Sequence, residues 1–153
     1  MRVLLDTNLL ARWLNVEDRD HATAKESLRV LRQQGHVPCL VPQNLYEFWS
    51  VATRPTDANG LGMSVSEANA EIQRFAPPLF RLLRDERAIL LRWQELVSKY
   101  EVKGKVAHDA QLVAAMLRHG ISHLLTFNEK DFTRFAEIRT VTPQAMASGA
   151  AFL

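Results

Sequence analysis

Four carboxylates in this sequence stand where they could do chemistry together. Each follows a short apolar run or lies in a helix beside one, and they are Asp6, Glu47, Asp109 and Asp131. Grouped carboxylates repel one another at neutral pH unless a cation neutralises them or some of them keep a proton. Hard oxygen ligands select Mg²⁺ or Mn²⁺, and such an ion can help water to attack a phosphodiester. If the four acids meet, they predict a Mg²⁺- or Mn²⁺-dependent site that hydrolyses nucleic acid.

Short apolar runs alternate with amphipathic stretches along the chain, and this alternation decides whether the acids can meet. The predicted strands are 3–5, 39–41, 79–83, 124–125 and 138–141. The predicted helices are 7–14, 20–34, 42–52, 64–75, 89–100 and 108–119. Such alternation favours an α/β fold with a mainly parallel sheet between helical layers, in which ligands bind at the carboxyl ends of the strands. All four acids lie at that side of the predicted sheet, so the connectivity permits one cluster.

Length and composition predict one globular domain over residues 1–153, with 47% hydrophobic and 24% charged residues. The single cysteine, Cys39, cannot form an internal disulfide, which excludes a disulfide-built secreted scaffold. No apolar run approaches the roughly 20 residues that span a bilayer, so we expect a soluble, cytoplasmic protein with no membrane partner. The net charge of +2 neither demands nor excludes a nucleic acid. A nucleic-acid assignment must therefore come from the site itself.

Each of the four acids also has an ordinary structural explanation. Asp6 is a favoured residue type for capping the helix that follows it, and Asp131 stands in a polar stretch that a surface turn would explain. Glu47 lies on the far side of its helix from the apolar stripe, so it is exposed unless that polar side lines a cleft. Asp109 could complement the helix dipole, but it shares a stripe with the apolar residues three, four and seven positions later. A carboxylate on a buried stripe needs a cation, hydrogen-bond donors or a shifted pKa.

Other polar and basic residues could support the same chemistry. Thr126 and Asn128 follow the strand 124–125 and could orient carboxylates or waters, or cap the next turn. Four basic residues could hold phosphates or simply form a solvated face, and they are Lys103, Lys105, Arg84 and Arg87. The five histidines show no zinc-binding spacing, so a zinc site is not expected.

Four segments of the sequence carry a resemblance to a known family. They are Leu4-Leu5-Asp6-Thr7-Asn8, Pro42-Gln43-Asn44-Leu45-Tyr46-Glu47, His108-Asp109-Ala110-Gln111-Leu112-Val113-Ala114 and Leu124-Leu125-Thr126-Phe127-Asn128-Glu129-Lys130-Asp131-Phe132. In this order they resemble the acidic motifs of PIN-domain ribonucleases, and most closely those of VapC-type toxins from type II toxin-antitoxin pairs. The resemblance runs from residue 1 to about residue 143, and nothing after Pro143 matches a motif.

The resemblance implies a three-layer α/β/α fold and an endoribonuclease that depends on Mg²⁺ or Mn²⁺. The residues that it implies as metal-binding acids are Asp6, Glu47, Asp109 and Asp131, with Asn8, Thr126 and Asn128 as supporting polar groups. It further implies an RNA substrate, a cognate antitoxin protein and a homodimer.

Other readings of the same residues remain open. A haloacid-dehalogenase-like phosphatase also places an aspartate after its first strand, but it needs a second aspartate where this chain has Asn8. A response-regulator receiver needs an acidic pair after the first strand, which is not evident. A metal-free ribonuclease that uses two histidines is a further alternative. The non-enzymatic alternative is a PIN-like module that binds RNA or a partner protein without cutting.

Overall fold

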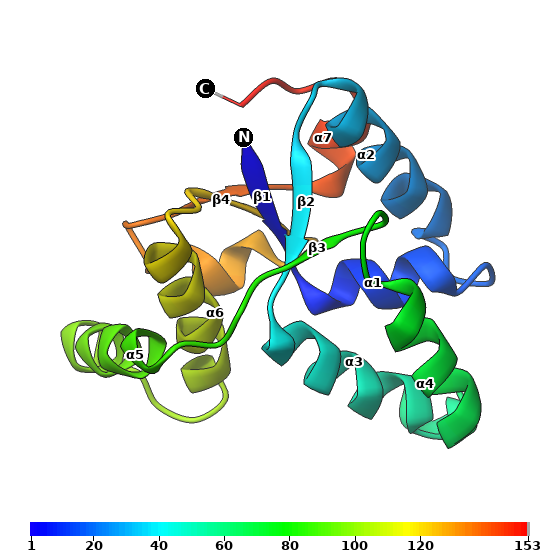
Figure 1. Ribbon diagram of the computed structural model, residues 1–153, viewed down its shortest axis with the longest axis horizontal. Helices are drawn as coiled ribbons and strands as arrows, with labels where there is room; N and C mark the ends of the chain where they lie inside the picture. The colour runs from blue at the N-terminus through cyan, green and yellow to red at the C-terminus, as the bar shows by residue number, and fades with distance from the viewer. Residues whose placement is uncertain (153) are drawn as a thin grey trace.

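Residues 1–152 are described in a computed structural model, and their five β-strands form one parallel sheet (Figure 1). In spatial order the strands are β3 (Arg81–Leu82), β2 (Val37–Leu40), β1 (Arg2–Leu5), β4 (His123–Leu125) and β5 (Arg139–Val141). β1 is central, because Leu4 pairs with Cys39 of β2 on one side and with Leu124 of β4 on the other. The strand order reverses between β1 and β4, and open α/β sheets bind ligands at the carboxyl ends of strands at such a point.

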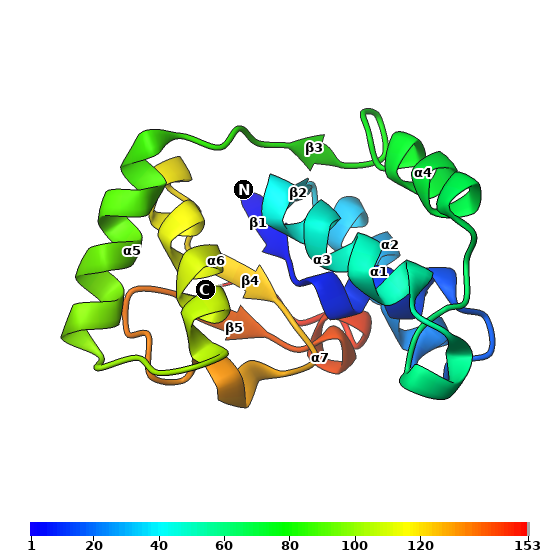
Figure 2. The ribbon, with the colours of Figure 1, turned by 90° about the horizontal axis from the view of Figure 1, so that it is seen from below.

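Helices cover both faces of this sheet (Figures 1 and 2). α5 (Arg87–Lys99) and α6 (Val106–His119) pack against each other on one face. The helices of the other face are α1 (Thr7–Leu14), α2 (His21–Gln33), α3 (Pro42–Thr53), α4 (Val65–Arg74) and α7 (Pro143–Ala147). The short 3₁₀ turns η1 (Thr56–Ala58) and η2 (Glu129–Phe132) complete the elements of the described residues. The predicted three-layer α/β/α architecture with a parallel sheet is confirmed.

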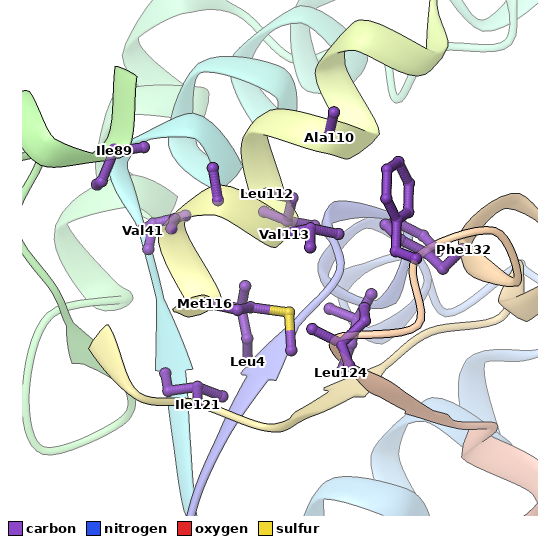
Figure 3. Packing of buried hydrophobic residues seen from close by; sticks show 14 of the residues in the cluster. Leu4, Val41, Ile89, Ala110, Leu112, Val113, Met116, Ile121, Leu124 and Phe132 are labelled. Atoms are coloured by element: carbon purple, nitrogen blue, oxygen red, sulfur yellow. The ribbon is translucent and has the colours of Figure 1, made fainter. Parts of the chain in front are cut away.

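Two hydrophobic cores lie on the two faces of the sheet because successive side chains of a strand point to opposite sides. In β1, Leu4 points into the core beneath α5 and α6, whereas Val3 and Leu5 point into the core beneath the other helices. Figure 3 shows Leu4 with Met116 of α6 and Leu124 of β4 in the first core. All five are fully buried. The continuous apolar run of the sequence is thus explained by burial on both faces.

The helix signals in the sequence act as predicted. The hydroxyl of Ser64 accepts a hydrogen bond from the Glu67 backbone N–H at 3.1 Å, and the Glu67 carboxylate accepts one from Ser64 N–H, so α4 starts with a capping box. Pro42 is the first residue of α3. Gly120 follows α6 with φ of +66°, a conformation that glycine adopts without strain.

Several boundaries differ from the prediction. The third strand comprises only Arg81–Leu82 instead of 79–83, and the helix expected from residue 108 begins two residues earlier, at Val106. α7 was not predicted. The sequence did contain a helix-start signal, namely a threonine followed by a proline at 142–143. In the structure the Thr142 side chain accepts a hydrogen bond from Ala145 N–H at 3.2 Å, and Pro143 is the first residue of the helix.

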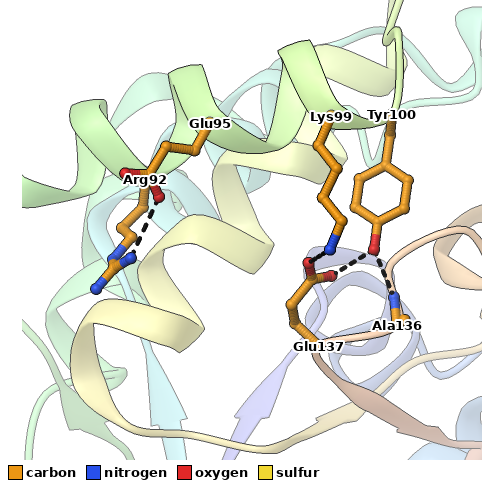
Figure 4. Close-up of polar contacts among 6 residues, drawn as sticks. All are labelled: Arg92, Glu95, Lys99, Tyr100, Ala136 and Glu137. Carbon is orange, nitrogen blue, oxygen red and sulfur yellow. Dashed lines mark hydrogen bonds and ion pairs between the residues drawn. The ribbon is translucent and has the colours of Figure 1, made fainter.

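A small polar cluster fastens α5 to the segment before β5 (Figure 4). The Tyr100 hydroxyl donates to Glu137 Oε2 at 2.8 Å and accepts from Ala136 N–H at 3.1 Å, while Lys99 Nζ lies 2.7 Å from Glu137 Oε1. Cys39 is buried in the sheet as a free thiol. Within residues 1–152, no helix is both long and apolar enough to cross a membrane.

Candidate functional site

The four predicted acids line one cavity of about 630 Å³ at the carboxyl ends of the central strands. Asp6 follows β1, Glu47 comes from α3, Asp109 from the first turn of α6, and Asp131 from η2 after β4. Connectivity only permitted this convergence, and the structure brings the four together. The cavity lies where the strand order reverses, which is the position expected for a ligand site.

Asp6 caps a helix and faces the cavity at the same time. Its Oδ1 accepts a hydrogen bond from the Thr7 backbone N–H at 2.7 Å, so it is the N-cap of α1. Its Oδ2 accepts from the Thr126 hydroxyl at 2.6 Å and from Asn8 Nδ2 at 3.2 Å. The Asp6 N–H donates to Leu125 O at 3.0 Å, which fixes its backbone to β4. The structural explanation of Asp6 as a helix cap is therefore confirmed, and the same side chain also lines the cavity.

Glu47 is held in place by two neighbours and is only partly exposed. Its Oε2 accepts from the Thr7 hydroxyl at 2.9 Å and its Oε1 from Gln43 Nε2 at 2.6 Å. Gln43 also donates to His108 O at 2.8 Å, which links α3 to the start of α6. The opposite side of α3 is buried through Phe48, so this helix packs on one side while its polar side lines the cavity.

Asn44 makes a buried connection that positions this polar side of α3. Its amide nitrogen donates to Leu5 O at 3.0 Å and to the Thr7 hydroxyl at 3.3 Å, and its oxygen accepts from Val41 N–H at 2.8 Å. The end of β1 and the start of α3 are therefore joined by one fully buried side chain. This connection holds Glu47 near Asp6.

Asp109 and Asp131 complete the acidic lining of the cavity. Asp109 is half-buried in the first turn of α6, as its place on an apolar stripe predicted, and the next residues of that stripe are buried. Asp131 is exposed at the rim, and its backbone N–H donates to Asn128 O at 3.0 Å within the 3₁₀ turn. The surface turn expected as the ordinary explanation is present, and it directs Asp131 to the cavity.

Burial and mutual repulsion shift the acid-base properties of this group. Burial, with added repulsion from Glu47 and Asp131, raises the pKa of Asp6 from 3.8 to about 6, against the opposing hydrogen bonds from Thr126 and Thr7. Burial, followed by repulsion from Asp131, Asp6 and Glu47, also raises the pKa of Asp109 to about 6. The carboxylates are thus close enough to oppose each other's ionisation, and a bound cation would relieve that cost.

The donor set fits a hard divalent cation that keeps part of its water. All four acids offer oxygen, and two buried oxygens beside them, Asn8 Oδ1 and Gln43 Oε1, have no hydrogen-bond partner in the described structure. Within residues 1–152, however, no group of three or more His, Cys, Asp or Glu side chains lies in an arrangement that could hold a metal ion. Mg²⁺ commonly binds through one or two carboxylates and retains several waters, so an open arrangement suits it better than it suits zinc.

The predicted supporting residues lie beside Asp6. Thr126 is fully buried, donates to Asp6 and accepts from the Asn128 backbone N–H at 3.0 Å. Asn8 and Asn128 line the cavity. Asn8 stands where a haloacid-dehalogenase-like enzyme needs its acid/base aspartate, and an amide that donates to Asp6 cannot take that role. Among the described residues no histidine lines the cavity, which removes the structural support for a two-histidine ribonuclease.

The four basic residues predicted to hold phosphates do not line this cavity. Lys103 and Lys105 are exposed in the loop before α6, and Arg87 is exposed at the start of α5. Arg84 lies in a separate hollow with His119, whose ring nitrogen bonds to Arg84 O at 2.8 Å. α6 runs antiparallel to the strands, so its C-terminal His119 is at the opposite end of the sheet from Asp109.

Arg12 is the basic residue that does line the cavity, and sequence reasoning missed it. A signal was present in α1, where Asn8, Ala11, Arg12 and Asn15 follow the spacing i, i+3, i+4, i+7. Such a stripe predicts one helix face, opposite the buried Leu9 and Leu10. The whole stripe lines the cavity.

Comparisons with known proteins identify the family and the fold of this chain. The sequence model described as "PIN domain" matches residues 3–138. No curated protein sequence matches the chain. The fold is similar to a chain of VapBC2 from Rickettsia felis bound to a promoter DNA fragment, with a TM-score of 0.71 and 14% identity over 93% of this chain and 98% of that one.

Two further solved structures share the fold. VapC20 from Mycobacterium tuberculosis, named as a toxin that cleaves the sarcin-ricin loop, gives a TM-score of 0.65 and 22% identity over 90% of this chain and 98% of that one. VapBC-1 from nontypeable Haemophilus influenzae gives a TM-score of 0.69 and 15% identity over 94% and 98%. With the match to the family model across most of its length, this chain belongs to the PIN domain family.

Proposed function

We propose that this protein is a Mg²⁺- or Mn²⁺-dependent endoribonuclease and the toxin of a toxin-antitoxin pair. The observation that carries the proposal is the convergence of Asp6, Glu47, Asp109 and Asp131 on one cavity. Membership of the PIN domain family supports a nuclease, and the VapBC and VapC structures that share the fold support the toxin-antitoxin context. The ion, the RNA substrate, the antitoxin, a homodimer and a cytoplasmic location are parts of this proposal.

The four carboxylates would hold the ion, which when bound neutralises phosphate charge and makes a water easier to deprotonate. Thr126 and Thr7 hold the carboxylates of Asp6 and Glu47 through their hydroxyls, so these oxygens are oriented before any ligand arrives. Gln43 fixes the second oxygen of Glu47. Preorganised oxygens need little rearrangement during reaction, which is what electrostatic catalysis requires.

The raised pKa values of Asp6 and Asp109 give these acids a second property. Without a cation, each keeps a proton to higher pH than an ordinary aspartate. Cation binding must displace these protons, so metal affinity is expected to fall as the pH drops below about 6.

The test is RNA cleavage by the purified protein. We expect cleavage of total RNA with Mg²⁺ or Mn²⁺, none in EDTA, and at least a 100-fold lower rate for Asp6→Asn and Asp109→Asn. Asp85→Asn is the matched control, because Asp85 is exposed and lies outside the cavity. Circular dichroism confirms that each variant is folded.

Two outcomes would contradict the proposal. Identical cleavage by Asp109→Asn and the wild type would mean that the cavity is not the catalytic site or that a contaminant cuts the RNA. RNA binding without cleavage by any form, with either ion present, would favour the non-cutting PIN-like module.

A further inference from the structure

The cavity that contains the four acids extends well beyond them. Its other end is lined by polar side chains from α1 and the loops after α1 and α3, with three apolar walls. The polar groups are Arg12, Asn15, Asp18 and Asn59, and the walls are Ala11, Val51 and Leu61. A volume of about 630 Å³ is in the range of sites that enclose a whole small ligand, so a phosphate at the acids leaves room for more of the substrate.

The loop after α3 forms a firm rim for this end of the cavity. Leu61 N–H donates to Val51 O at 3.0 Å and Gly62 N–H donates to Arg54 O at 2.8 Å, so the loop folds back on α3. A Cβ at Gly60 would lie 2.0 Å from Arg54 O, so only glycine fits this approach. Asn59, with φ of +59°, is thereby held at the rim.

Arg12 is arranged as a fixed polar wall and not as a free phosphate clamp. Its Nη1 lies 3.2 Å from Asp20 Oδ2, and its guanidinium carbon lies 4.3 Å from the centre of the Phe127 ring. Its charge is matched by Asp20, and Asp18 adds a further carboxylate to the lining. A second phosphate would meet no net positive charge here.

Hydrogen-bonding capacity remains on three of the lining side chains. Asp18 Oδ1 accepts from Asp20 N–H at 2.8 Å, which leaves its other oxygen as an acceptor. Asn15 Oδ1 accepts from Glu17 N–H at 3.2 Å, which leaves its amide N–H groups as donors. Within residues 1–152 the Asn59 side chain has no hydrogen-bond partner. Uncharged donors, one carboxylate acceptor and apolar walls together suit a flat heterocycle.

We propose that this end of the cavity binds the nucleobase beside the scissile phosphate, and that the base is guanine. The inference rests on the proposed function and names a specificity element for it. Proteins read unstacked RNA bases through hydrogen bonds to their edges. Guanine presents two adjacent N–H donors, which suit the free oxygen of the Asp18 carboxylate, next to a carbonyl oxygen, which suits the amides of Asn15 and Asn59. The apolar side chains of the lining offer contact surface to the ring.

The test compares four fluorescent octaribonucleotides, oligo(U) alone or with a single central G, A or C. Binding is measured by fluorescence anisotropy in EDTA, in the Asp109→Asn background so that the RNA is not cut. We expect the oligonucleotide with G to bind about tenfold more tightly than the other three. Adding Asp18→Asn should remove most of this preference, because it replaces the carboxylate by an isosteric amide that still accepts from Asp20 N–H.

Asn59→Gly is the second variant, because glycine keeps the left-handed backbone and removes only the side chain. We expect it to weaken binding of the oligonucleotide with G several-fold, whereas Asp85→Asn should change nothing. The wild type with Mn²⁺ should cut these RNAs next to G.

Equal affinity for the four oligonucleotides, or a G preference that survives both substitutions, would overturn the base site. If wild-type cleavage still depended on Asp6, the proposed function would stand although the base site would be refuted. If the protein neither bound nor cut RNA, the proposed function would fail and the base site with it.

Discussion

Replacing Asp6 with asparagine is expected to stabilise the metal-free protein at neutral pH, although it removes a residue of the candidate site. Burial and the neighbouring carboxylates raise the pKa of Asp6 from 3.8 to about 6 in the folded protein. Since the folded-state pKa lies above the unfolded value, the folded protein binds this proton more tightly. The stability of the wild type therefore falls as the pH rises from about 4 to about 6. Asp6→Asn does not show this loss, because asparagine does not titrate.

The magnitude follows from the pKa and the hydrogen bonds. A rise from 3.8 to about 6 corresponds to about 3 kcal/mol of destabilisation by the ionised carboxylate above pH 6. Asparagine still caps α1, but its amide cannot accept from both Thr7 and Thr126, which costs about 1 kcal/mol. The net gain is about 2 kcal/mol, or about 4–8 °C in Tm for a chain of this size.

The assay is urea unfolding in EDTA, followed by tryptophan fluorescence, at several pH values between 4 and 8. The free energy of unfolding of Asp6→Asn, relative to that of the wild type, should increase as the pH rises from about 4 to about 6. Saturating Mg²⁺ should then stabilise the wild type more than the variant, because the ion relieves the same repulsion. Asp85→Asn, which changes an exposed carboxylate outside the cavity, should show neither effect.

A difference between Asp6→Asn and the wild type that does not depend on pH would refute this reasoning. It would show that the carboxylate is as well solvated in the folded protein as in the unfolded chain, and that its neighbours do not repel it. If Mg²⁺ stabilised both proteins equally, Asp6 would not take part in binding the ion.

Three further substitutions test other parts of the account. Thr126→Val removes the hydroxyl that donates to Asp6, so the pKa of Asp6 should rise further. The acidic limb of the pH profile of cleavage should therefore move to higher pH. If that limb does not move, the hydrogen bond does not affect the pKa of Asp6. Met116→Ala should cost about 3 kcal/mol in urea unfolding, because Met116 is fully buried between α6 and the sheet, and a loss below about 1 kcal/mol would contradict the packing. Tyr100→Phe removes the hydroxyl that links Glu137 and Ala136 (Figure 4) and should cost about 1 kcal/mol in urea unfolding, so an unchanged stability would contradict the contribution of these hydrogen bonds.

The sequence sufficed for the architecture because local signals and the global fold agree. The run Val3 to Leu5 is apolar on both faces, and the structure buries it between two cores. Where an element is short, its predicted bounds were wrong. Strand β3 has only two residues, and its pairing to Leu40 is a long-range property that no local pattern contains.

The convergence of the acids could be predicted from topology, but their local contacts could not. Parallel strands end at one edge, so Asp6 and Asp131 were expected near each other. Glu47 was different, because helical periodicity favoured exposure. Its position depends on Asn44 and Thr7, which join α3 to β1 across about 40 residues of sequence.

The basic residues show most clearly what sequence alone lacks. Arg84 and Arg87 are near a predicted strand in sequence, yet charge type says nothing about which end of the sheet a side chain reaches. Arg12 reaches the cavity because α1 turns one polar stripe towards it. The stripe was visible in the spacing, whereas the cavity it lines is made by segments distant in sequence.

Calorimetric titration of the metal-free protein with Mn²⁺ tests the central claim most directly. If Asp6, Glu47, Asp109 and Asp131 act as one cation site, the wild type and Asp85→Asn should bind Mn²⁺ alike, while Asp6→Asn and Asp109→Asn should bind it at least tenfold more weakly. If Asp6→Asn and Asp109→Asn bound Mn²⁺ as tightly as the wild type, these carboxylates would share a cavity without sharing an ion.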